Sequence, residues 1–296
     1  ESVAECCRNR WPSWPEYPTR MEEREAAKYE RPFQHVLEHI KPERERNQRE
    51  VYRQYYWRHV RPRPAMRAAF SGLGKYLVTT RVAKHRLFAW IAAPTMPDSS
   101  LIAFARVDDY FLGILHSRFH EIWSRGQATQ LREASSGTRY TPTSCFDTFP
   151  FPWPLGQEPD DSSEVLAVAE AARELDAMRT RWLNPPEWVG QKVHTFAAAE
   201  GGPWDVSIRN GDTGGEGGEY CIVEPIDAPV EMKLKKRTLT ALYNEMPRWL
   251  SDAHKKLDVC VAKAYGDATG ESGIHAGASD EEFLVFLLEL NQQRSG

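Results

Sequence analysis

Apolar residues recur along this chain with two different periods, and each period predicts one kind of element. Runs rich in aromatic and β-branched residues between turn formers predict strands, whereas apolar residues three or four positions apart predict helices. The predicted strands cover residues 76–80, 87–91, 101–106 and 220–223. The predicted helices cover residues 22–30, 33–39, 42–59, 109–123, 165–182, 238–243, 249–265 and 280–292. Strands therefore concentrate in the first half of the chain and helices in the second.

This distribution predicts an α+β protein of two domains. The first, residues 1–155, mixes strands with helices, and its residues 1–30 form a connector because closely spaced prolines interrupt regular structure there. The second, residues 156–296, is mainly helical and begins with a helix-capping signal at residues 162–163. Its glycine-rich stretch near residues 201–218 has no apolar period and predicts a loop.

The composition narrows the class of protein. A chain of 296 residues with 41% hydrophobic residues can bury a core in each of two domains. No window approaches the roughly eighteen apolar residues that a membrane span needs, so we expect no membrane span, secretory leader or membrane partner. Five cysteines without a CxxC pair suit a reducing compartment, and we expect a cytoplasmic protein without structural zinc. Since the chain starts at Glu1, we expect it to be a piece of a longer polypeptide.

The net charge of −4 conceals two oppositely charged parts. Residues 31–149 hold 19 Lys and Arg against 10 Asp and Glu, an excess of nine, so the rest of the chain carries −13. Within residues 31–86 there are 14 cations against 4 acids, and the cations alternate with aromatic residues. Such segregation is typical of a nucleic-acid footprint, because Arg matches phosphate and guanine edges. The alternative is a solvated helix face that carries Arg for solubility only.

Two short motifs look like those of an adenine methyltransferase. Residues 70–74 (FSGLG) fit FxGxG, the glycine turn of amino-methyltransferases, and residues 184–187 (NPPE) come close to the catalytic NPPY motif. A cofactor-binding glycine turn must follow a strand and open a helix, but here a predicted helix comes first and a strand second. Glu187 also stands where an aromatic ring should stack on the flipped base, with Trp188 one residue late. A complete small methyltransferase is therefore an alternative, not the main hypothesis.

Two histidine pairs have the i, i+4 spacing of metal ligands. His35 with His39, and His116 with His120, could each share a helix face, yet neither pair has a third ligand nearby in the sequence. No nucleophile–base set, phosphate-binding loop or spaced carboxylate pair stands out either. We therefore expect no catalytic residue, no metal and no cofactor in this chain.

Several segments resemble, in the same order, the C-terminal part of MmeI-like type II restriction-modification enzymes and related adenine-specific DNA methyltransferases. In the first domain they are residues 36–44 (VLEHIKPER), 61–67 (RPRPAMR), 76–86 (YLVTTRVAKHR), 109–118 (DYFLGILHSR), 139–143 (RYTPT) and 146–150 (FDTFP). In the second domain they are residues 181–185 (RWLNP), 237–244 (RTLTALYN) and 279–282 (SDEE).

The resemblance implies a sequence-specific DNA-binding role. In polypeptides of this family the catalytic core precedes a target-recognition domain and a helical C-terminal domain, and this chain resembles the last two. The methyltransferase core, which binds S-adenosyl-L-methionine and the extruded adenine, is then expected upstream in the same bacterial polypeptide. The implied partners are double-stranded DNA and that core, because the recognition domain holds the site while the core flips its base. A non-catalytic helical interaction module is a further alternative.

Two sets of residues are candidates for DNA contacts. The candidates for phosphate contacts are Arg81, Lys84, His85 and Arg86, beside a predicted strand, helped by Arg61, Arg63 and Lys75. Base contacts suit the polar loop before Tyr140, since Arg pairs with guanine, Gln with adenine and Glu with cytosine. The candidates in this loop are Gln127, Gln130, Arg132, Glu133 and Arg139. The alternatives are surface solubility for the first set and a solvated hairpin tip for the second.

Overall fold

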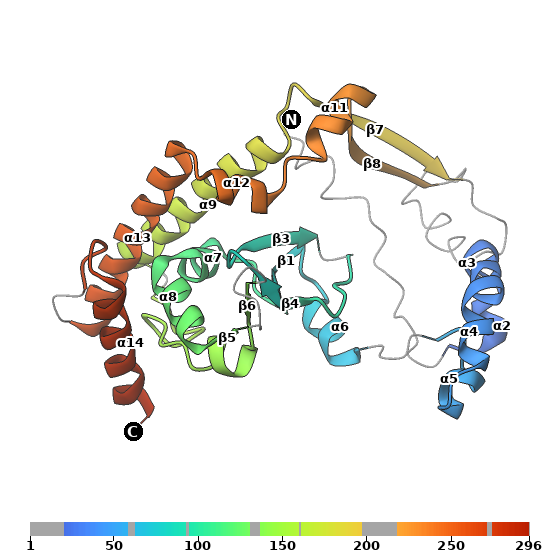
Figure 1. The fold of residues 1–296 in the computed structure, drawn as a ribbon, viewed down its shortest axis with the longest axis horizontal. Helices are drawn as coiled ribbons and strands as arrows, with labels where there is room; N and C mark the ends of the chain where they lie inside the picture. The colour runs from blue at the N-terminus through green and yellow to red at the C-terminus, as the bar shows by residue number, and fades with distance from the viewer. Residues whose placement is uncertain are drawn as a thin grey trace. The chain divides into compact units, whose positions relative to one another are not determined.

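Secondary structure falls into two units in the computed structural model of this chain (Figure 1). The residues it describes are 21–58, 63–92, 95–130, 137–159, 161–196, 218–270 and 274–295. One unit comprises residues 1–71 and 190–224, and the other residues 72–189 and 225–296. The predicted α+β class is confirmed, because helices predominate and the strands form small sheets. Over the described ranges, no helix is long and apolar enough to cross a membrane.

The first unit contains short helices where the sequence predicts a long one. They are α2 (Glu23–Ala26), α3 (Glu30–His35), the π-helical turn η1 (Val36–Ile40), α4 (Lys41–Glu45), α5 (Glu50–Gln54) and α6 (Pro64–Phe70). The single helix predicted over residues 42–59 is wrong, because Asn47 Oδ1 accepts the Arg49 amide at 2.9 Å and turns the chain between α4 and α5. Arg44 Nη1 then donates to the carbonyl oxygen of Tyr56 at 2.9 Å, which holds the segment after α5 against α4.

A two-stranded sheet continues this part of the chain. β7 (Val189–Phe196) pairs with β8 (Gly218–Pro225). β8 contains the strand predicted over residues 220–223, whereas β7 has no counterpart among the predicted strands. Most of the predicted connector, residues 1–20, and almost all of the predicted glycine-rich loop, residues 201–217, lie outside the described residues.

The second unit begins with a three-stranded antiparallel sheet. Its strands are β1 (Lys75–Thr80), β3 (Phe88–Ala92) and β4 (Leu101–Phe104), in the spatial order β3-β1-β4. On β1, Leu77 pairs with Trp90 of β3 and with Phe104 of β4. The central strand is buried from Tyr76 to Thr79, so this sheet is part of the core. All three strands confirm the corresponding sequence predictions.

The rest of the second unit is mainly helical, and most of its helices contribute to the core that the sheet begins. They are α7 (Asp109–His116), α8 (Arg118–Gln127), the π-helical turn η3 (Pro142–Phe146), α9 (Ser163–Leu183), α11 (Ala228–Leu234), α12 (Leu239–Glu245), α13 (Arg248–Thr269) and α14 (Asp280–Ser295). The capping signal at residues 162–163 is confirmed, since Ser162 Oγ accepts the Val165 amide at 3.3 Å. α11 has no counterpart among the predicted helices.

Elements on both sides of the predicted boundary near residue 155 lie in the second unit. α9 packs against both α7 and α13, and a Cβ on Gly113 of α7 would lie only 2.7 Å from Val168 Cγ1 of α9. One hydrophobic core therefore runs from Leu77 on β1 to Leu290 on α14. The physical reason is that α7 is buried from Tyr110 to His116, and such a helix needs covering on every side.

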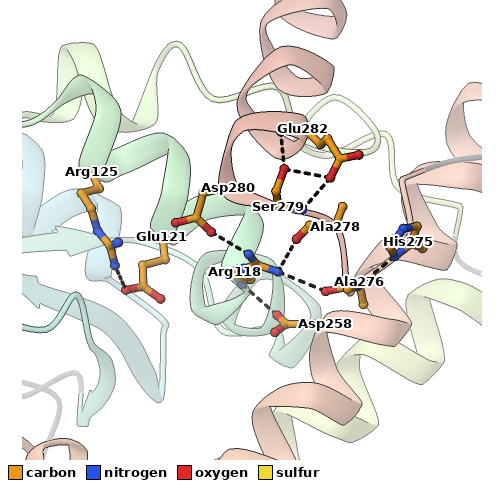
Figure 2. A network of polar contacts seen from close by, with 11 residues as sticks. Arg118, Glu121, Arg125, Asp258, His275, Ala276, Ala278, Ser279, Asp280 and Glu282 are labelled. Carbon is orange, nitrogen blue, oxygen red and sulfur yellow. Dashed lines mark hydrogen bonds and ion pairs between the residues drawn. The ribbon is translucent and has the colours of Figure 1, made fainter.

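A tertiary contact breaks the helix predicted over residues 109–123. α7 ends before Ser117, whose backbone is extended, and α8 starts at Arg118. The Arg118 amide donates to Asp258 Oδ1 of α13 at 2.8 Å, so a residue 140 positions away caps α8. The Arg118 side chain also donates to the Ala278 carbonyl at 2.8 Å and to Asp280 Oδ1 at 2.6 Å, which fixes the start of α14 (Figure 2). Burial raises the pKa of Asp258 to about 6 in spite of that amide.

A buried arginine joins four elements of this unit. Arg179 of α9 is 2% exposed, and its Nη2 donates to the Phe88 carbonyl of β3 at 3.1 Å and to Asp176 Oδ1 at 2.8 Å. Its Nη1 lies 2.6 Å from His116 Nε2 of α7 and 3.5 Å from the Tyr243 hydroxyl of α12. Burial disfavours the charge, but Tyr243 and Asp176 raise the pKa of Arg179. Burial and the neighbouring Arg179 hold the pKa of His116 well below its usual range.

Removing this guanidinium is expected to destabilise the fold. We expect Arg179→Ala to lower the free energy of unfolding by about 3 kcal/mol, because it leaves buried acceptors on several elements without donors. Arg181→Ala is the matched control, since Arg181 is exposed on the same helix, and it should change the value by less than about 0.5 kcal/mol. Urea unfolding at neutral pH measures both, and equal losses would contradict the central role of Arg179.

Candidate nucleic-acid interface

A second small sheet carries several of the candidate DNA-binding residues. Its strands β2 (Val82–Ala83), β6 (Thr138–Arg139) and β5 (Thr129–Gln130) are antiparallel in the order β2-β6-β5. Arg139 on the central strand pairs with Val82 and Thr129, and the following amide, that of Tyr140, donates to the Arg81 carbonyl at 2.7 Å. β5 and β6 therefore form a hairpin, and residues 131–136 between them lie outside the described residues.

Tyr140 attaches this sheet to the core. Its side chain is buried, and its hydroxyl lies 3.0 Å from His120 Nε2 of α8. His120 Nδ1 lies 3.1 Å from the Leu115 carbonyl, so the ring donates there and accepts from Tyr140. Burial lowers the pKa of His120 to about 3, which keeps this ring neutral. The C-terminal end of the hairpin is thus fixed to the core by Tyr140.

A close backbone approach holds β6 against β2. Gly137, immediately before β6, has φ +82°, and a Cβ there would lie 2.2 Å from the Ala83 carbonyl oxygen. Only glycine combines this left-handed conformation with such a contact. The position of the hairpin relative to the segment after β1 therefore depends on this residue.

The phosphate candidates differ in how free their side chains are. Arg81 is exposed, and no polar partner of its guanidinium is found among the described residues. Lys84 Nζ and His85 Nε2 both contact Asn244 Oδ1 of α12, at 2.7 Å and 2.9 Å. Lys75 is engaged, since its Nζ lies 3.9 Å from the centre of the Trp90 ring and 3.6 Å from Asp109 Oδ1.

The side chain of Arg86 donates hydrogen bonds that connect the end of β1 with β6 of the second sheet. Its Nη1 donates to the Thr80 carbonyl and to Thr79 Oγ1, the latter at 3.1 Å, and its Nη2 donates to the Thr138 carbonyl at 3.1 Å. The guanidinium also lies 4.8 Å from the centre of the Tyr140 ring, and burial lowers the pKa of Arg86. A phosphate contact by Arg86 would have to compete with these bonds, so we assign it a structural role.

The two remaining phosphate candidates precede the second unit in the sequence. Arg63 is exposed at the start of α6 and belongs to the first unit, whereas Arg61 lies outside the described residues. The aromatic residues that alternate with cations in the first unit pack against them. Arg58 lies 4.3 Å from the centre of the Tyr55 ring, and Lys41 Nζ lies 4.7 Å from that of Tyr56. Part of the charge of residues 31–86 is therefore structural.

The candidates for contacts with DNA bases lie on the hairpin or next to it in the sequence. Gln127 is exposed at the C-terminal end of α8, Gln130 lies on β5, and Arg139 is exposed on β6. Arg132 and Glu133 belong to residues 131–136 and lie outside the described residues. The structure thus places three of the five candidates on one hairpin and the helix that leads into it, and a contact with bases remains a prediction for all five.

Ion pairing separates the cations of residues 72–140 into two groups. Those with a carboxylate oxygen within reach are Lys75, Arg106, Arg118 and Arg125. In the described part of the chain, no carboxylate pairs with Arg81, Lys84 or Arg139. All three lie on the β2-β6-β5 sheet or in the segments that adjoin it, and we call them the basic cluster. Among the cations of residues 72–140, those without a carboxylate partner in the described part of the chain thus lie close together.

Sequence reasoning did not identify Asn244 as part of this surface. Asn244 belongs to the segment over residues 237–244 that carries the family resemblance, but the sequence gives no sign that it contacts Lys84, 160 positions away. An exposed Asn at a helix end is ordinarily interpreted as a cap or a solvated residue. Only the three-dimensional arrangement brings it to the basic cluster.

The elements around the methyltransferase-like glycine motif stand in another order than a cofactor site needs. α6 precedes the glycines of residues 70–74 and β1 follows them, the reverse of the order that such a site needs. Asn184 is exposed at the C-terminal end of α9. Among the described residues, no group of three or more His, Cys, Asp or Glu could hold a metal ion. His116 and His120 contact Arg179 and Tyr140 instead.

Comparison with known proteins gives one distant likeness. No protein-family model and no curated protein matches the chain. Among solved structures, the chain is similar to the type IIL restriction-modification enzyme MmeI in complex with DNA, with 16% identity and a TM-score of 0.46. The match covers 86% of this chain and 25% of that one, so this chain spans about a quarter of its length. A likeness this distant does not define the function.

Placing a side chain at Gly137 is expected to disrupt the second sheet. We expect Gly137→Ala to lower the free energy of unfolding by about 2 kcal/mol or more, because the new Cβ would collide with the Ala83 carbonyl. Gly156→Ala is the matched control: its φ is +80°, but nothing lies within 4 Å of a Cβ there, so only about 1 kcal/mol should be lost. Chemical unfolding of the two variants compares them directly, and similar losses would show that the close approach is unimportant.

Proposed function

We propose that this chain binds duplex DNA through the β2-β6-β5 sheet and its hairpin. The observation that carries the proposal is the basic cluster, whose cations have no carboxylate partner while others nearby do. Unpaired cations on one surface release counterions when they meet phosphates, and this release supplies much of the affinity for DNA.

The two sets of candidate residues suit two tasks. Exposed Arg81, with Lys84 and His85, would contact phosphates and fix the position of the protein on the duplex. The β5–β6 hairpin is a two-stranded ribbon, which fits the major groove, and it carries Gln130 and Arg139 next to Arg132 and Glu133. Because Tyr140 and Gly137 fix its base, the hairpin can hold side chains in a constant register against base edges.

We further propose that the chain is the target-recognition part of a longer restriction-modification or adenine-specific methyltransferase polypeptide. The ordered segments of sequence resemblance support this proposal. The chain would then hold the site without modifying it. An upstream catalytic core would bind S-adenosyl-L-methionine and flip the target adenine.

Removal of the exposed cations tests the phosphate contacts. We expect the Arg81→Ala, Lys84→Ala double variant to bind every duplex more weakly and to lose about 0.9 from the log–log salt slope for each phosphate contact removed. The Arg125→Ala, Arg173→Ala double variant removes the same charge, but from cations paired with Glu121 and Asp109, and should keep the wild-type slope. Fluorescence anisotropy with labelled duplexes over a salt series measures both. Equal slopes in the two double variants would contradict the proposed surface.

Exchange of two hairpin residues tests base reading. Wild-type protein and a variant carrying Gln130→Arg and Arg132→Gln each select duplexes from a randomised pool, and the retained DNA is sequenced. We expect the preferred base to change at one position, since one bidentate contact carries roughly 1 to 3 kcal/mol of discrimination. Non-specific affinity should stay the same, because the net charge does not change. An identical selected sequence would mean that the hairpin does not read bases.

A further inference from the structure

Asn244 links two of the proposed phosphate-binding side chains. Its Oδ1 lies 2.7 Å from Lys84 Nζ and 2.9 Å from His85 Nε2. A Lys ammonium can only donate, so the amide oxygen rather than the amide nitrogen must face it. With this orientation His85 Nε2 also donates, and both lone pairs of the Asn244 oxygen are used.

Within the cluster of Asn244, Lys84 and His85, the Asn244 amide and the Lys84 ammonium therefore present only donors to solvent. Asn244 Nδ2 keeps two N–H groups and Lys84 keeps two more, and no acceptor for them is found in the described part of the chain. All three side chains are exposed or half-buried. Phosphate oxygens accept several hydrogen bonds and carry negative charge, so they match this set of donors.

The interior of the unit fixes the position of Asn244. α12 begins with Thr238 Oγ1 accepting the Ala241 amide at 3.1 Å. Near its end, Tyr243 is buried, and its hydroxyl lies 2.8 Å from His254 Nε2 of α13 and 3.5 Å from Arg179 Nη1. Burial and the charge of Arg179 lower the pKa of His254 to about 4, so this contact involves a neutral ring. Asn244 is the next residue, and a rigid backbone carries it.

We propose that Asn244, Lys84 and His85 form one phosphate-binding cluster, in which Lys84 and the amide N–H of Asn244 contact the bound phosphate and the hydrogen bond from His85 helps to fix the orientation of Asn244. This proposal rests on the proposed DNA-binding function and deepens it. A free Lys side chain loses rotamer freedom when it binds, and the contact with Asn244 removes part of that freedom beforehand. The site thus joins residues from the strand-containing half and the helical half of the chain.

The experiment measures the affinity of the full chain for a labelled duplex over a salt series. We expect Asn244→Ala to weaken binding about threefold to tenfold, as loss of a hydrogen bond to a charged group does. Asn244→Asp, which has nearly the same shape, should weaken it more than tenfold and lower the salt slope by about 0.9, because its carboxylate pairs with Lys84 and repels phosphate. Asn184→Ala and Asn184→Asp are the matched controls, since Asn184 is also exposed at the end of a helix in this unit, and they should bind like the wild type.

Two further readouts separate this role from a structural one. In the Lys84→Ala background, Asn244→Ala should have a smaller effect than in the wild type, because one partner of Asn244 is already gone. Thermal unfolding should show that Asn244→Asp is as stable as the wild type, since the new carboxylate gains an ion pair with Lys84. A protein in which Asn244 only stabilises the fold would keep its DNA affinity in this variant.

The outcomes distinguish this inference from the function on which it rests. If the wild type binds duplex DNA with the expected salt dependence while both Asn244 variants match it, the inference is overturned and the DNA-binding function stands. Equal weakening by Asn244→Asp and Asn184→Asp would also overturn it, because the effect would then be one of net charge. If the wild type binds no duplex at low salt, the proposed function itself fails, and the inference fails with it.

Discussion

The guanidinium of Arg179 is a charge in the interior, and the packing of the second unit depends on how it is satisfied. A buried cation without partners would cost several kcal/mol, so its two terminal nitrogens have acceptors, whereas Nε has none among the described residues. Those acceptors come from β3, from α7, from its own helix α9 and from α12. The sheet and the helices of the second half can therefore meet in few other arrangements. The shared apolar core supplies most of the driving force, and the hydrogen bonds of Arg179 connect the sheet with the helices.

This constraint extends to the proposed DNA-binding surface. Tyr243 points inward to Arg179 and His254, whereas Asn244 points outward to Lys84 and His85. Successive residues of a helix are separated by about 100°, so one short helix can serve both environments. At the hairpin, Tyr140 contacts His120 in the core. Gly137 allows the close approach of β6 to β2, and Arg86 donates to the Thr138 carbonyl, so the hairpin is held against its neighbours.

Many arginines of this chain are structural, and the count of positive charges alone does not locate a binding surface. Arg44, Arg86 and Arg118 each donate to backbone carbonyls that end or connect elements. The arginine side chain suits this task because its planar group presents several donors in fixed directions. What distinguishes the basic cluster is the absence of carboxylate partners among the described residues, not the number of its charges. To separate cations that have a carboxylate partner from those that have none, the positions of both the cations and the acids are needed.

The sequence by itself determined the elements whose signal is local. The strands β1, β3 and β4 and the start of α9 at Ser162 follow from side-chain periods and capping residues within a few positions. The tertiary structure alone decided the break at Ser117, because its cap, Asp258, is 140 residues from Arg118. It also decided the second sheet, since strands of two residues have no period, and the role of Asn244, since its partner Lys84 lies 160 residues away. Hydrogen bonds between distant residues and close backbone contacts depend on how the whole chain packs, and a local pattern contains no information about that packing.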